Sequence, residues 1–142
     1  MDTKVTRLDL ARSLMMYQHA GQVDKAGEPY YLHPLAVADG VDTEDCKIVA
    51  LLHDTLEDTS LQYETVLNLF GREVADAVLA MTHWEGEPYF DYVRRVKENP
   101  IARKVKLLDL RHNMDLRRLN HVTETDLARV EKYKKAVRIL EE

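Results

Sequence analysis

One histidine and three carboxylates stand close together in the segment 53–58, HDTLED, directly after an apolar stretch. Burying such groups without compensation costs a large amount of free energy. A divalent cation satisfies an imidazole and carboxylates at the same time and removes that cost. We therefore interpret His53 and Asp54 as ligands of a metal ion.

The spacing inside this segment indicates a second pair of functional groups. On a helix, Glu57 lies one turn beyond His53, and Asp58 lies one turn beyond Asp54. Carboxylates at the C-terminal end of a helix oppose the helix dipole, so a solvated helix end explains them poorly. We expect Glu57 and Asp58 to face the same cavity as the metal and to act as acid/base groups.

A complete metal site needs ligands from other parts of the chain. The natural candidates are His33, which precedes Pro34 at the entrance of a helix, and Asp109 in a late helix. Asn113 lies one turn beyond Asp109 on the same face. Nitrogen and oxygen ligands with open positions suit Mn²⁺, Fe²⁺ or Zn²⁺ better than a closed structural zinc site, which prefers thiolates. We expect one such ion, which activates a water molecule as the nucleophile.

The elements that must position these residues are helices. The chain has 5 Gly, 4 Pro and almost no alternating β-branched runs, which is typical of helices joined by short turns. We expect a single all-α domain over residues 1–142, folded as a bundle of about eight helices. The predicted helices are residues 6–19, 34–40, one capped by Asp42, 61–69, 72–82, 89–98, 101–118 and 123 to the C-terminus. In the last of these, Thr123 and Asp126 resemble a capping box.

Composition and charge exclude several classes of function. The net charge is −5 and no long run of Lys and Arg occurs, so we expect no nucleic-acid partner. The apolar runs are too short to span a membrane, and no export signal is visible at the N-terminus, so we expect a cytoplasmic protein. The single cysteine, Cys46, lies in an apolar stretch and is predicted to be a buried small hydrophobe. A homo-oligomer is compatible with the sequence.

Three segments in order resemble one known family. They are residues 19–34 (HAGQVDKAGEPYYLHP), 51–59 (LLHDTLEDT) and 105–114 (VKLLDLRHNM). Together they look like the hydrolase domain of RelA/SpoT-type alarmone enzymes and their small stand-alone relatives. One His-Asp pair alone carries little information, whereas three motifs in register are specific.

The resemblance implies a helical HD-type fold and a manganese-dependent phosphohydrolase that removes the 3′-pyrophosphate of guanosine tetra- and pentaphosphate. It makes the metal ligands His33, His53, Asp54 and Asp109, and it gives Glu57 and Asp58 the handling of water and protons. It also implies that Lys25 and Asn113 contact a small nucleotide substrate. His19 falls in the first motif, where a place in the pocket wall and a structural hydrogen bond are equally compatible.

One position departs from the family pattern. Asp24 stands directly before Lys25, where the alarmone hydrolases usually have arginine, and this exchange reverses a charge beside the expected nucleotide. Two alternatives therefore stay open. The enzyme acts on another nucleotide or phosphorylated metabolite, or the chain is a non-catalytic nucleotide-binding module. The second alternative does not explain why the four ligands, Glu57 and Asp58 are all present.

Overall fold

The computed structural model describes residues 4–142, and over that range it consists of helices and connecting loops without a strand. The predicted all-α fold is therefore confirmed. The nine helices of this range are α1 (Arg7–Gln18), α2 (Leu32–Asp39), α3 (Glu44–Leu52), α4 (Thr55–Asp58), α5 (Tyr63–Phe70), α6 (Arg72–Ala80), α7 (Tyr89–Lys97), α8 (Pro100–Asn113) and α9 (Glu124–Glu141).

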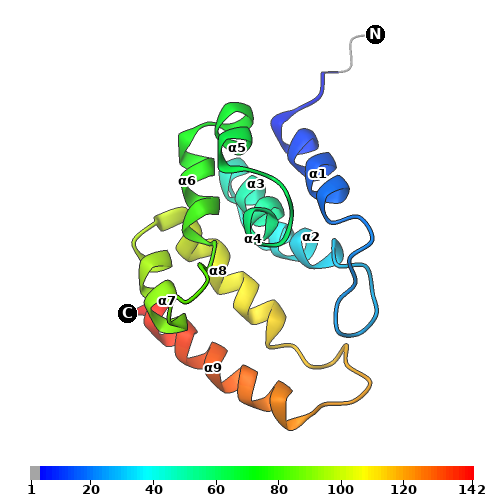
Figure 1. The fold of residues 1–142 in the computed structure, drawn as a ribbon, viewed down its shortest axis with the longest axis vertical. Helices are drawn as coiled ribbons and strands as arrows, with labels where there is room; N and C mark the ends of the chain where they lie inside the picture. The colour runs from blue at the N-terminus through cyan, green and yellow to red at the C-terminus, as the bar shows by residue number, and fades with distance from the viewer. Residues whose placement is uncertain (1–3) are drawn as a thin grey trace.

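Helix α3 lies at the centre of the fold, between α1 and α6 in Figure 1. It packs against α1, α2, α6 and α8. Every residue from Ile48 to Leu52 is buried, so the helix is apolar on all sides, as expected for a helix enclosed by others. Cys46 near its start is also buried, as predicted. The residues that follow Leu52 therefore begin inside the protein.

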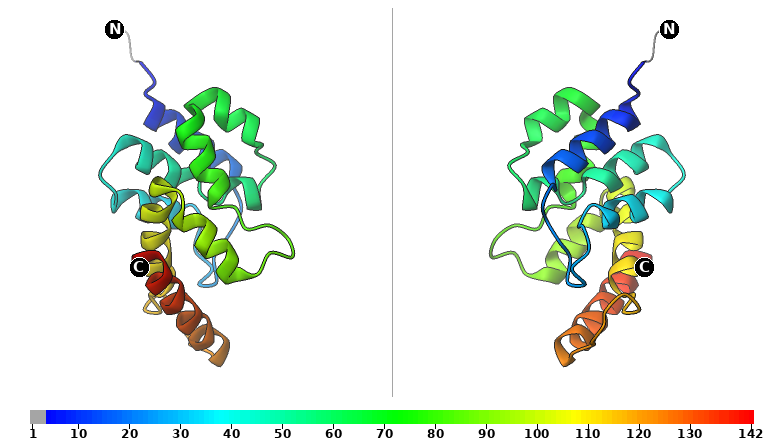
Figure 2. Two further views of the ribbon diagram at one scale, coloured as in Figure 1. Left: turned by 90° about the vertical axis from the view of Figure 1, so that its left-hand side faces the viewer. Right: turned by 90° about the vertical axis from the view of Figure 1, so that its right-hand side faces the viewer.

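Helix α8 joins the two ends of the molecule. It contacts α2, α3 and α6 on one side and α7 and α9 on the other. Figures 1 and 2 show α1 near one end of the molecule and α9 near the other. A residue on α8 can therefore face groups from both parts of the fold. None of the described helices is long and apolar enough to cross a membrane.

Side-chain caps explain where several helices begin. Thr123 and Asp126 form the predicted capping box at α9, in which each side chain accepts a hydrogen bond from the backbone of the other. The carboxamide of Asn99 accepts from two backbone amides at the start of α8. The prediction for α3 was wrong by one residue: Thr43, and not Asp42, has extended backbone and accepts from the amide of Cys46.

Two larger differences from the predicted helices affect the site, whereas the other helices begin and end within two residues of the prediction. The segment 53–58 does not continue the preceding helix, because α3 ends at Leu52 and a separate single turn, α4, follows Asp54. This adds a ninth helix to the eight predicted. Helix α8 ends at Asn113, five residues before the predicted end at Arg118. The cause is Asp115, whose carboxylate accepts from the backbone amide two residues later and so competes with helical hydrogen bonds.

The central position of α3 predicts a large stability effect. Leu52 has no exposed surface, so Leu52→Ala should lower the free energy of unfolding by about 2–5 kcal/mol in urea denaturation. Leu69 on α5 is a matched control because 42% of it is exposed. Leu69→Ala should cost less than about 0.5 kcal/mol. Equal losses in the two variants would contradict the central role of α3.

Candidate metal centre

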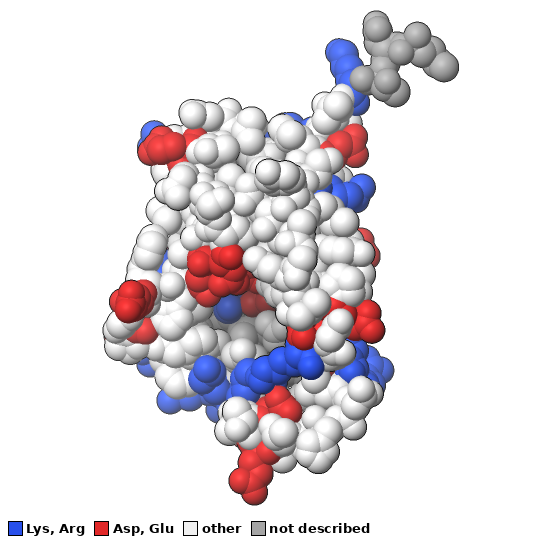
Figure 3. Space-filling view, turned by 45° about the vertical axis from the view of Figure 1, so that its right-hand side comes forward, with Lys and Arg blue, Asp and Glu red and all other residues white. Residues whose placement is uncertain are grey.

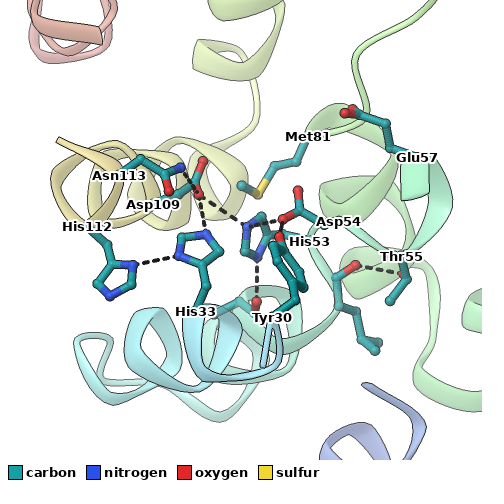
Figure 4. Close-up of polar contacts among 12 residues, drawn as sticks. Tyr30, His33, His53, Asp54, Thr55, Glu57, Met81, Asp109, His112 and Asn113 are labelled. Atoms are coloured by element: carbon teal, nitrogen blue, oxygen red, sulfur yellow. Dashed lines mark hydrogen bonds and ion pairs between the residues drawn. The ribbon is translucent and has the colours of Figure 1, made fainter. Parts of the chain in front are cut away.

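Three predicted ligands converge from three helices. His33 comes from the first turn of α2, His53 from the residue after α3, and Asp109 from α8. One ligand atom of each lies within 4.8 Å of the others, and all three residues are buried. His33 Nε2 is 2.7 Å from Asp109 Oδ1, and His53 Nε2 is 3.3 Å from the same oxygen. Figure 4 shows both imidazole rings turned toward this carboxylate.

Asp54, the fourth predicted ligand, borders this cluster. Its Oδ2 lies 3.1 Å from His53 Nε2 and accepts a hydrogen bond from the hydroxyl of Tyr30. Burial, together with the nearby Asp109 carboxylate, raises the pKa of Asp54 well above its usual range. The break between α3 and α4 places the Asp54 side chain beside that of His53, as Figure 4 shows.

The hydrogen bonds of His53 test whether these residues fit a cation. Its Nδ1 lies 2.6 Å from the carbonyl oxygen of Ala50. A carbonyl only accepts, so Nδ1 carries a proton and Nε2 is the ring atom left to bind a cation. This buried Nε2 has no hydrogen-bond partner, although carboxylate oxygens of Asp54 and Asp109 lie near it. One imidazole nitrogen and two carboxylates that converge in a buried place are groups that a divalent cation binds together, so the donor set fits a divalent metal.

Two side chains that were not among the predicted site residues contact the ligands from outside. His112 Nδ1 is 2.6 Å from His33 Nδ1, so a hydrogen bond on that side leaves His33 Nε2 facing Asp109. The ammonium group of Lys106 is 2.9 Å from Asp109 Oδ2. Both residues lie three positions from Asp109 on α8, and this helical spacing is the signal that could have identified them.

The charge of Asp109 depends on these neighbours. Burial alone would raise the pKa of this carboxyl group, but the Lys106 ammonium and the imidazoles of His53 and His33 hold it well below its usual range. Asn113 also donates to Asp109 Oδ1, over 3.1 Å. Asp109 is therefore an ionised carboxylate, which is the form that binds a metal.

A cavity of about 330 Å³ opens beside the cluster. We call it the metal-side cavity. The residues around it include Asp54, Glu57, Tyr92, Lys106, Asp109 and Asn113.

The two predicted acid/base groups, Glu57 and Asp58, differ in their position relative to the metal-side cavity. Glu57 lines the metal-side cavity, and its carboxylate accepts from the backbone amide of His83 over 2.7 Å. Asp58 does not line this cavity. Burial raises the pKa of Asp58, and the imidazoles of His19 and His53 act against that shift. Of the predicted pair, the structure brings only Glu57 to the metal-side cavity.

A second hollow of about 320 Å³ adjoins the first. We call it the loop-side hollow, and the residues around it include Asp24, Lys25, Asn113, Arg118, Arg129 and Tyr133. Asn113 and Tyr133 line both spaces, and the two predicted substrate contacts, Lys25 and Asn113, both line the loop-side hollow. Figure 3 shows a face hollowed between a cluster of acidic side chains and a band of basic ones.

His19 lies behind this region. Its Nδ1 is 2.8 Å from the side-chain oxygen of Gln22, and its ring packs against Tyr30 at 4.8 Å between centroids. Tyr30 in turn donates to Asp54. His19 therefore supports the site through Tyr30 and does not itself join the three-ligand cluster.

Several curated proteins are similar to this chain in sequence. The GTP pyrophosphokinase of Myxococcus xanthus is 35% identical over 87% of this chain and 19% of that protein. The guanosine-3′,5′-bis(diphosphate) 3′-pyrophosphohydrolase of Aquifex aeolicus is 37% identical over 83% of this chain and 18% of that protein. The bifunctional (p)ppGpp synthase/hydrolase SpoT of Escherichia coli is 33% identical over 80% and 18%. The chain thus spans about a fifth of the length of these curated relatives.

A solved structure also shares the fold. It is described as a metazoan ortholog of SpoT that hydrolyzes ppGpp, and it superimposes with a TM-score of 0.77 over 99% of this chain and 88% of that chain, at 24% identity. The family model described as HD domain matches residues 11–119, a range that includes all four predicted ligands. This chain belongs to the HD domain family.

Proposed function

We propose that the chain is a metal-dependent phosphohydrolase that removes the 3′-pyrophosphate of guanosine 3′,5′-bis(diphosphate). The observation that carries the proposal is the buried, unpartnered Nε2 of His53, which faces two carboxylates beside a cavity. The Aquifex aeolicus and Escherichia coli relatives are named for hydrolysis of the same nucleotide, which supports this proposal.

The ligands in this proposal are His33, His53, Asp54 and Asp109. A divalent transition metal, with manganese preferred and iron or zinc as alternatives, would activate water and polarise a phosphoryl oxygen at this site. Lys106 and His112 keep Asp109 and His33 oriented toward it.

Glu57 is our candidate for the proton acceptor. Its carboxylate is at the metal-side cavity, and the hydrogen bond from the amide of His83 limits the positions that it can take. In this proposal Asp58 does not accept the proton. It supports the site through its electrostatic interaction with His19 and His53. Lys106 also lines the cavity, where its ammonium group can stabilise negative charge on the phosphates.

The metal-side cavity and the loop-side hollow together suit a substrate with anionic groups at two ends. The scissile pyrophosphate would occupy the metal-side cavity, and the rest of the nucleotide would lie past Asn113 in the loop-side hollow, where Lys25 is available. Another nucleotide is the second candidate substrate, because Asp24 replaces an arginine of the family. A panel of nucleotides scored for release of pyrophosphate or phosphate separates the two candidates, and turnover of none of them would contradict the proposed function.

Metal binding provides a prediction that is independent of substrate. The purified protein loaded with Mn²⁺ should contain about one ion per chain by elemental analysis, and His53→Ala should lose it because the unpartnered Nε2 disappears. The exposed His121 gives a matched control, and His121→Ala should retain the metal. Equal metal content in the two variants would remove His53 from the ligand set.

The role of Glu57 predicts a kinetic effect without loss of metal. Glu57→Gln should lower kcat by about 10²–10⁴-fold, the usual contribution of a positioned general base, while the metal content stays the same. Asp58→Asn should lower kcat less, because Asp58 does not line the metal-side cavity. Unchanged turnover in Glu57→Gln would show that another group accepts the proton.

The contact between His112 and His33 predicts a change in metal affinity. His112→Ala should weaken Mn²⁺ binding by about 10–100-fold in a calorimetric titration, because His33 loses the partner that orients its ring. His112→Asn, which keeps a polar group able to hydrogen bond, should recover part of the affinity. If both variants bind Mn²⁺ as tightly as the wild type, His112 does not position His33.

A further inference from the structure

Asp24, the position that departs from the family pattern, has one oxygen committed to its own loop. Its Oδ1 accepts from the backbone amides of Ala26 and Glu28, at 2.9 and 3.0 Å. These contacts shape the turn that carries Lys25. A large part of the negative charge of Asp24 is therefore spread over backbone hydrogen bonds.

The other oxygen reaches across the fold. Asp24 Oδ2 is 3.1 Å from Arg118 Nη1, which belongs to the segment between α8 and α9. Only 17% of the Asp24 side chain is exposed, against 40% of the Arg118 side chain. A guanidinium has five N–H donors, and this contact uses one of its nitrogens. The pair thus holds Arg118 at the hollow while other donors stay available.

The adjacent arginine is arranged in the opposite way. The guanidinium of Arg117 closes on the Asp115 carboxylate, and 90% of the Arg117 side chain is exposed. Arg118 lines the loop-side hollow, whereas Arg117 does not. Two neighbouring arginines of the same segment therefore differ in whether they face the candidate substrate region.

Two carboxylates line the loop-side hollow, those of Asp24 and Asp115, and a third, that of Asp126, contacts the lining residues Lys25 and Arg129. Asp24 and Asp126 accept backbone hydrogen bonds, and Asp115 is held by Arg117. Lys25 and Arg129, which share Asp126, add two cations to the one contributed by Arg118. The hollow can therefore receive an anionic group although its formal charges nearly cancel.

We infer that Arg118 is a substrate-binding and specificity-determining residue, which contacts the phosphates remote from the scissile bond, and that Asp24 is the positioning residue that holds it there. This inference rests on the proposed function for the identity of the nucleotide. The proposed reaction would leave guanosine diphosphate as its product. Because that product retains the 5′-phosphates, it serves as a probe that the enzyme does not hydrolyse at the 3′ position.

Binding of guanosine diphosphate and of guanosine to the Mn²⁺-loaded protein, measured by calorimetry, tests the inference. Arg118→Gln should weaken binding of the diphosphate by about 10–100-fold, the loss expected for one charge-assisted hydrogen bond, and should leave guanosine binding unchanged. The control Arg12→Gln, at an exposed arginine of α1 that does not line the hollow, should change neither. Equal effects of Arg118→Gln on both ligands, or no effect on either, would overturn the inference.

A double-mutant cycle tests the part played by Asp24. Asp24→Asn should alter the affinity for guanosine diphosphate in the wild-type background and leave it unchanged in the Arg118→Gln background, because Asp24 acts through Arg118. The same effect in both backgrounds would overturn the positioning role. If the diphosphate responds as expected but guanosine tetraphosphate is not hydrolysed, the proposed function fails and the assignment of Arg118 stands.

Discussion

The contact on which the site depends is the approach of two carboxylates to Nε2 of a buried imidazole. Ala50 accepts from Nδ1 of His53, so Nε2 is the ring atom that lies near Asp54 and Asp109. Without a cation, two carboxylates would stand together in the protein interior, where a charge is costly to bury. Lys106 offsets the charge of Asp109 from one side only. The surrounding packing must therefore hold the ligands in place, and α3 and α8 provide that packing.

The position of α8 explains why one helix serves both ends of the proposed substrate site. Its contacts with α2 and α3 bring Asp109 to the histidines, and its contacts with α9 bring Asn113 beside Tyr133. Asn113 donates to Asp109 and also lines both hollows. A displacement of α8 would therefore change the ligand geometry and the substrate region together. This coupling makes the length of α8, which ends at Asn113, a functional feature.

The parts of the site that could be predicted from sequence are those with a local physical cause. An apolar helix that leads into His53 and Asp54 is hard to explain without a metal, whereas His33 and Asp109 came mainly from the resemblance to a known family. The neighbouring groups His112 and Lys106 were not predicted as site residues, because a histidine or lysine on a helix is usually solvated. The separation of Glu57 from Asp58 was also missed. Adjacent residues on a helix point in different directions, and in α4 only Glu57 of this pair lines the metal-side cavity.

Asp24 shows why substrate preference is harder to predict than the metal ligands. From the sequence alone, an aspartate in place of the family's arginine suggests that the charge beside the expected nucleotide is reversed. In the fold, its carboxylate is shared by two backbone amides and by Arg118, which lies 94 positions away in the chain. The electrostatic field at the loop-side hollow depends on all of these contacts, and not on Asp24 or Arg118 alone. Placing arginine at position 24 would put two guanidinium groups together and remove the acceptor that shapes the loop. Replacing Asp24 by the arginine of the family would therefore remove two backbone hydrogen bonds and one ion pair together. Its effect on substrate binding depends on the position that Arg118 then takes.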